Sequence, residues 1–199
     1  MRTRGNVLVG APEVRAAGGF QIGPANPDTD LYPTSAVADI AEGLTLAAAG
    51  FISEDGVTKT VDRSTEKIKD WNGDTMVIVQ SDHSVTLQTT FCEAANADVL
   101  KMIFGDENVV IAGDSITTVD TADELPHRSI LIDIRGSATS KIRLFAPDAQ
   151  VTEVGEVQFV RSNVIQYQVT MELFGDDLGK KLIQFIEKNY TPTDPEPGA

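Results

Sequence analysis

Between positions 165 and 173 the chain alternates apolar and polar residues without a fault, in the order Ile165-Gln166-Tyr167-Gln168-Val169-Thr170-Met171-Glu172-Leu173. Successive side chains of a β-strand point to opposite faces, so this stretch separates into two sets. One face carries Ile165, Tyr167, Val169, Met171 and Leu173, and the other carries Gln166, Gln168, Thr170 and Glu172. A strand with one apolar and one polar face is typical of an antiparallel sheet that covers a core on one side only.

The same period of two recurs upstream in two further segments. Residues 85–91 set Val85, Leu87, Thr89 and Phe91 against Thr86, Gln88 and Thr90. Ile130, Ile132 and Ile134 alternate likewise, and they precede a hairpin candidate at residues 136–137 with 141–145 as the partner strand. Residues 82–84 are expected to form a polar turn between strands at 77–80 and 85–91. These segments predict a mainly β protein, built as an antiparallel β-sandwich or barrel.

One α-helix, flanking the sheet, is predicted near residues 96–104. Asn96 is a suitable N-cap, Asp98 suits the positive end of the helix dipole, and Gly105 can end the helix. The apolar stripe between them consists of Val99, Leu100, Ile103 and Phe104. A helix this short is not stable alone, so we expect it to pack on the sheet. For residues 180–190 the pattern leaves a second helix and a last strand equally open.

The ends of the chain differ in composition from its middle. Residues 1–43 are rich in Gly, Pro, Ala and Asn and lack sustained periodicity, which predicts an N-terminal arm and extended segment. Residues 44–190 are expected to form the sandwich. Residues 191–199 form a Pro-rich acidic tail that we expect to be disordered.

Charge and apolar content exclude several classes of protein. The net charge of −14 opposes nucleic-acid binding, which normally shows as a basic patch. Arg2, Arg4 and Arg15 make the first 18 residues basic, and such an arm on an acidic body suits either self-association or a simple solvated terminus. No apolar stretch approaches the roughly 20 residues of a membrane span, and the N-terminus lacks a signal-peptide apolar region. With a single cysteine, Cys92, we expect a cytoplasmic origin and no intrachain disulfide.

Motifs that carry chemistry are scarce. Asp82-His83-Ser84 has the residue types of a hydrolase triad, but sequence neighbours cannot orient one another in series as that mechanism requires. Ser64-Thr65-Glu66-Lys67 matches a serine–lysine pattern without its companion Lys-Thr-Gly box. Asp28-Thr29-Asp30 begins like a calcium loop, but the following residues do not fit one. The sequence therefore predicts no catalytic residue, no metal site, no cofactor and no enzyme.

Three segments resemble the major tail proteins, or tail tube proteins, of long-tailed phages, especially those of actinobacteria. They are Asn6-Val7-Leu8-Val9-Gly10-Ala11-Pro12, then Gly50-Phe51-Ile52-Ser53-Glu54-Asp55-Gly56-Val57-Thr58 with its continuation at 68–74, and residues 90–96 leading into 98–105. Together with the strand at 167–174 the resemblance spans most of the chain. The middle segment is its most specific part.

The resemblance implies a β-sandwich with a flanking helix, shared with secretion-system tube proteins. In that family subunits form homohexameric rings with one continuous inner barrel, and the rings stack into the tube of a non-contractile siphophage tail. The implied partners are further copies of the chain, a tape-measure protein and a tail terminator. DNA is expected to pass through without specific binding, and no membrane is involved. The implied location is the virion tail, after assembly in the host cytoplasm.

Within this interpretation, two groups of residues acquire expected roles. Lumen-facing candidates are Thr86, Gln88, Thr90, Gln166, Gln168, Thr170 and Glu172, although an ordinary solvent-facing sheet surface fits them equally well. Inter-ring loop candidates are Asp55, Lys59, Arg63, Lys67 and Trp71, since residues 55–71 are charged and poorly patterned. Trp71 is either a core residue or a contact anchor, and the polar setting favours contact. The assembly arm would use Arg2, Arg4 and Arg15.

Two alternatives remain open. A β-sandwich binding module of a virion or cell surface would recognise carbohydrate or a receptor, but it needs clustered exposed aromatics, and the chain has one Trp and three Tyr. A tail-terminator or distal-ring protein would not account for the segments at 53–57 and 70–74.

Overall fold

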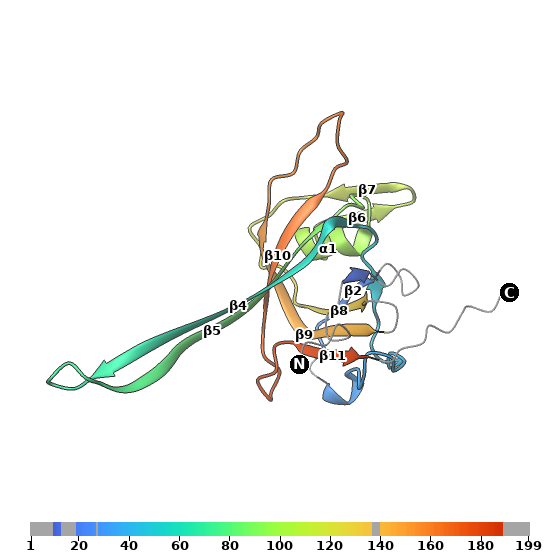
Figure 1. The fold of residues 1–199 in the computed structure, drawn as a ribbon. Coiled ribbons are helices and arrows are strands. Elements are labelled where there is room, and N and C mark those ends of the chain that lie inside the picture. The colour runs from blue at the N-terminus through green and yellow to red at the C-terminus, as the bar shows by residue number, and fades with distance from the viewer. Residues whose placement is uncertain (1–9, 13–18, 27, 137–139, 189–199) are drawn as a thin grey trace.

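The computed structural model describes residues 10–12, 19–26, 28–136 and 140–188, and the predicted mainly β class is confirmed (Figure 1). In this part of the chain nine strands join one antiparallel sheet in the order β3-β2-β8-β9-β10-β5-β4, with β1 beside β8 and β11 beside β9. A separate hairpin joins β6 to β7. The strands are β1 (Ala11–Pro12), β2 (Phe20–Pro24), β3 (Ala47–Ala48), β4 (Ile52–Lys69), β5 (Thr75–Phe91), β6 (Val109–Ala112), β7 (Ser115–Thr118), β8 (Arg128–Arg135), β9 (Lys141–Val154), β10 (Tyr167–Leu173) and β11 (Ile183–Glu187).

Strand β9 takes part in both layers of the sandwich. Its first half lies between β8 and β11, and from Ala149 onward it pairs with β10. The sheet thus turns back on itself, and the ring of Phe20 in β2 meets that of Phe91 in β5 edge-on, with centroids 5.2 Å apart. The core between the layers also contains Leu87, Ile130 and Met171.

The predicted helix is confirmed as α1 (Ala97–Phe104). Asn96 caps it, because its Oδ1 accepts hydrogen bonds from the backbone N–H groups of Asp98 and Val99 at 3.1 and 3.3 Å. Gly105 follows the helix with a φ of 96°, a conformation that L side chains rarely adopt. The buried side chains are Val99, Leu100, Met102 and Ile103, while Phe104 is half-buried against Tyr167. The apolar stripe therefore packs on the sheet as expected.

The segment between β2 and β3 covers the outer face of β8 and β9. Tyr32 and Leu44 pack there against Leu131 and Phe145. Within the segment predicted as an N-terminal arm and extended segment (residues 1–43), β2 is a buried strand of the sheet and residues 28–43 belong to this cover. The cover has almost no regular backbone hydrogen bonding and therefore no periodicity to detect in the sequence. Arg2, Arg4, Arg15 and the predicted tail at 191–199 lie outside the described residues.

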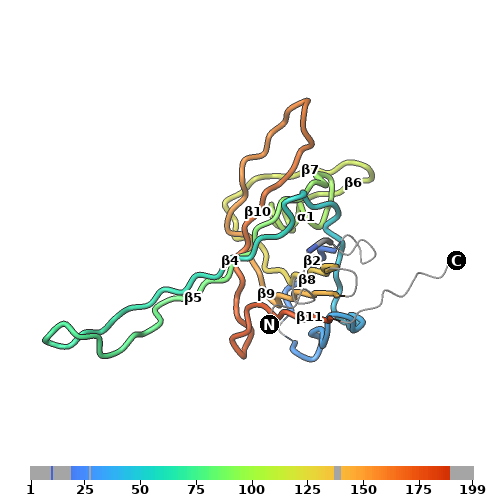
Figure 2. Tube along the Cα trace, in the orientation of Figure 1, coloured from blue at the N-terminus to red at the C-terminus, as the bar shows by residue number. Residues whose placement is uncertain are grey.

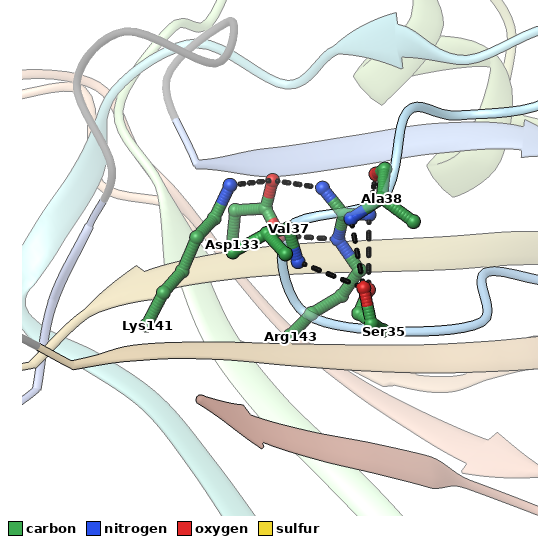
Figure 3. A network of polar contacts seen from close by, with 6 residues as sticks. All are labelled: Ser35, Val37, Ala38, Asp133, Lys141 and Arg143. Atoms are coloured by element: carbon green, nitrogen blue, oxygen red, sulfur yellow. Dashed lines mark hydrogen bonds and ion pairs between the residues drawn. The ribbon is translucent and has the colours of Figure 1, made fainter. Parts of the chain in front are cut away.

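A buried ion pair fastens this cover to the sheet (Figure 3). Asp133 of β8 and Arg143 of β9 are cross-strand partners, joined from Nε to Oδ1 at 2.7 Å and from Nη2 to Oδ2 at 2.9 Å. Arg143 Nη1 also donates to the backbone carbonyls of Ala38 at 2.6 Å and Ser35 at 3.3 Å. Lys141 adds a second cation 3.4 Å from Asp133. The two charges thus bring together segments about a hundred residues apart.

Strands β4 and β5 form one long hairpin that projects from the body (Figures 1 and 2). Its turn lies at residues 70–74, where Asp70 N–H donates to the carbonyl of Asp74 and Gly73 N–H to that of Asp70. The turn expected at Asp82-His83-Ser84 is therefore wrong, since β5 runs through these residues without a break. The polar composition there reflects solvent on both sides of a two-stranded ribbon.

Three further segments lie in the second half of the chain. Residues 128–135 and 141–154 form the expected hairpin, with Arg135 opposite Lys141. Residues 183–187 are a strand, β11, which settles the choice left open for 180–190. Between β9 and β10 the chain makes a long connection at residues 155–166 without regular structure.

Candidate lumen and assembly surfaces

A strip of polar side chains runs across β5 and β10. The register sets Thr90 opposite Gln168, Gln88 opposite Thr170, and Thr86 opposite Glu172. Residues directly opposite each other in an antiparallel pair share a face, so two polar faces predicted separately form one surface. Thr90 is nevertheless buried, and Gln166 precedes β10 and is outside this ladder. On the opposite face Leu87, Val169 and Met171 are buried, which confirms the phase of the alternation.

The strip continues onto the two neighbouring strands. On β4, Thr58 and Thr60 lie opposite Gln88 and Thr86. On β9, Gln150 lies opposite Glu172. These residues were missed in the sequence because β4 is polar at nearly every position and shows no alternation. The apolar–polar–apolar alternation Ala149-Gln150-Val151 is the sequence signal that could have located Gln150. In the structure Ala149 and Val151 are buried.

Glu172 is paired rather than free. Its Oε2 accepts a hydrogen bond from Ser84 Oγ at 2.7 Å, and its Oε1 lies 3.6 Å from Lys181 Nζ. Lys181 also donates to the backbone carbonyl of His83 at 2.6 Å, where β5 leaves the body. Lys181 thus offsets the charge of Glu172, and the strip presents mainly neutral hydroxyl and amide groups.

Two strand edges of the described sheet lie unpaired at the level of the polar strip. Among the described residues no strand pairs with the second edge of β4, nor with residues 150–154 of β9 on the side away from β10. Residues 57–60 of β4 are linked to residues 150–154 through the ladders of β5 and β10. An exposed edge of this kind is a ready template for pairing with another chain.

The inter-ring candidates lie on the projecting hairpin. Asp55, Lys59, Arg63 and Lys67 lie on strand β4 of this hairpin, and their role between rings stays a prediction. Trp71 stands in the terminal turn and is fully exposed, with a relative accessibility of 101%. Trp71 is therefore not a core residue of the isolated subunit.

The far part of the hairpin carries apolar side chains on both faces. Ile68 lies opposite Val77, and Val79 shares their face, while Ile78 points to the other. Met76 stands at a register shift of the ladder. All five are between 45% and 61% exposed. The run Met76-Val77-Ile78-Val79 is the sequence signal for this surface, because consecutive apolar residues in a strand are typical of burial on both sides.

No catalytic arrangement is found at the residues considered in the sequence. Ser84 Oγ bonds to Glu172, and Asp82 Oδ1 accepts from the backbone N–H of His83, so the three groups do not act in series. Within the described ranges, no three His, Cys, Asp or Glu residues come together as a metal-binding group. The helical part of those ranges is too short to cross a bilayer.

Comparisons with known proteins give one family and several distant folds. No curated protein matches this sequence. The tube-terminating cap of the anti-feeding prophage is 8% identical, with a TM-score of 0.44, 92% of this chain and 98% of that chain covered. The sheath–tube complex of an extracellular contractile injection system, PVC, is 9% identical, with a TM-score of 0.41, 83% of this chain and 86% of that chain covered. A model of the phage tail tube protein family matches residues 9–197, and the chain therefore belongs to that family, whose members are structural components of the virion tail.

Proposed function

We propose that this protein is the repeating subunit of a siphophage tail tube, assembled as stacked homohexameric rings that form the channel for DNA delivery. The observation that carries the proposal is the pair of free sheet edges on either side of the polar strip. Family membership supplies the wider setting of a tail tube.

Ring closure would proceed by strand pairing between copies. The strands β4, β5, β10 and β9 alternate in direction, so β9 of one copy runs antiparallel to β4 of a copy placed beside it by rotation. Residues 150–154 would then pair with the region of residues 57–60. Closing the barrel satisfies the edge hydrogen-bonding groups of every copy and removes the aggregation hazard of open edges.

The polar strip would line the lumen. Neutral Thr and Gln side chains hydrate the wall, and a chain of net charge −14 provides no excess of cations to hold phosphates. DNA would pass without specific binding. A tape-measure protein would occupy the lumen before ejection, and a tail terminator would close the stack after assembly in the host cytoplasm.

Electron microscopy combined with sedimentation velocity tests this proposal. The purified protein, examined over a wide range of concentration, should give rings of six copies and, at higher concentration, tubes. A particle that stays monomeric throughout, without tubes in the presence of the remaining tail proteins, would refute the proposed function. Rings of another copy number would correct only the hexamer.

A further inference from the structure

The sheet that carries the polar strip has a projection at each end. Strand β10 runs antiparallel to β5, with Tyr167 opposite Phe91 at the root of the hairpin. The connection at residues 155–166, which enters β10, therefore leaves the sheet at the end away from the hairpin turn. Figure 2 shows these two segments as long projections that leave the body in different directions. We call residues 66–79 the distal ribbon and residues 155–166 the root loop.

The distal ribbon is unsupported within its own subunit. The last β5 residue paired with β10 is Thr86, so beyond it the hairpin is a two-stranded ribbon. Such a ribbon is marginally stable in water by itself. Its exposed apolar residues lie on both faces, as described above, and Trp71 adds a fully exposed aromatic ring at the turn. A surface of this composition indicates a contact with another protein surface.

The root loop, like the distal ribbon, carries exposed apolar side chains. Its exposed apolar residues are Phe159 at 77%, Val160 at 46%, Val164 at 59% and Ile165 at 36%. The charges among its residues, Glu156 and Arg161, cancel. Two projections with exposed apolar side chains thus stand at opposite ends of one sheet.

We propose that the distal ribbon of one copy docks on the root loop of a copy in the next ring, a contact that rests on the proposed function. Two different surfaces of the same chain that bind each other make a heterologous, head-to-tail association. Each copy then offers a ribbon to one neighbouring ring and a root loop to the other. Such an association repeats without end, as a tube requires, and it buries both apolar surfaces with a single contact.

Two double variants separate the surfaces. The ribbon variant carries Val77→Ser and Val79→Ser, and the loop variant carries Phe159→Ser and Val160→Ser. Both should form rings and fail to form tubes, with the critical concentration for tubes raised at least about tenfold, the effect of losing an interface anchor. Val37→Ser, at an exposed apolar residue of the cover, is the matched control and should form tubes like the wild type.

Mixing the two variants gives the sharper result. Each still carries one intact surface, so rings assembled separately and then combined have one productive contact, the ribbon of the loop variant on the root loop of the ribbon variant. The expected product is a pair of rings of twice the ring mass, measured by sedimentation velocity, and neither variant forms it alone.

The outcomes distinguish this contact from the proposed function. The docking would be overturned if the loop variant formed tubes. It would also be overturned if the mixture gave no ring pairs although the wild type forms tubes. Either result would leave the ring proposal intact. Wild-type protein that never associates refutes both. If a serine pair lowers the melting temperature, Phe159→Glu and Ile78→Lys replace it as single variants, and each should fail to form tubes. A chain that carries both changes should form tubes again, because the two new charges attract each other; a double variant that forms rings but no tubes would count against the contact.

Discussion

At the scale of single residues, Asp133 joins β8, β9 and the cover into one unit. Asp133→Ala would leave Arg143 buried without its partner, and breaking a buried pair in this way costs about 3–5 kcal/mol. The free energy of unfolding in urea should fall by that amount. Replacing both Asp133 and Arg143 by Leu should cost less than Asp133→Ala, because the guanidinium that would lack its partner is removed as well and only Lys141 loses a carboxylate neighbour. Equal losses in the single and double variants would mean that the cover, and not the ion pair, determines the stability.

Gln168 and Glu172 differ in what substitution would do, although both lie on the polar strip. Gln168 is exposed, so Gln168→Lys should leave stability unchanged. Virions built of this subunit should eject DNA more slowly, especially at low salt, because the added cations attract phosphate. Glu172→Lys should instead lose about 1 kcal/mol of stability, since it removes the Ser84 bond and faces Lys181. Unchanged ejection kinetics for Gln168→Lys would place this face outside the lumen.

Ionisation of the Tyr32 phenol in the cover makes the stability of the protein depend on pH in the alkaline range. Burial, with the nearby carboxylates of Asp176, Asp177 and Asp28, raises the pKa of Tyr32 to about 12. The unfolded chain ionises this phenol near pH 10, so its contribution to stability is present below pH 10 and is lost as pH rises toward 12. The difference in unfolding free energy between wild type and Tyr32→Phe, measured in urea at pH 9 and above pH 11, should shift in favour of the variant. A difference independent of pH would contradict the raised pKa.

At the scale of elements, α1 contributes to the core through one face. Ile103 is 5% exposed and belongs to the main core cluster. Ile103→Ala should therefore cost roughly 2–5 kcal/mol, the usual range for emptying a buried aliphatic site. Lys101→Ala, on the same helix but only half-buried, is the control and should change little. A cost well below 1 kcal/mol for Ile103→Ala would mean that the helix is not needed to close the core.

At the scale of the whole molecule, we expect the N-terminal arm to contribute to assembly and the body to determine folding. The strands that the structure describes begin with β1 at Ala11. Deleting residues 1–9 removes Arg2 and Arg4, so the variant should keep its melting temperature and assemble less well, as seen by light scattering. Normal assembly would show that these arginines are a solvated terminus, and unfolding would place the segment in the sandwich.

The sequence by itself determined the features that are local. Alternation identified the phase of β5, β8 and β10, and a cap, an apolar stripe and a glycine identified α1, because these signals repeat within a few residues. Periodicity did not locate the hairpin turn at residues 70–74, since the distal ribbon is exposed on both faces and has no single polar side. The local signal for this turn is the dipeptide Asn72-Gly73.

Only the tertiary structure decided which segments meet. The register that places Thr170 beside Gln88 joins residues 82 positions apart, and the bond from Arg143 to Ala38 spans 105. These contacts depend on which surfaces are left to cover once the sheet has formed, and no local pattern carries that information. For the same reason the cover resembled an arm in the sequence, and Glu172 looked like a free charge until Lys181, from beyond β10, was placed beside it.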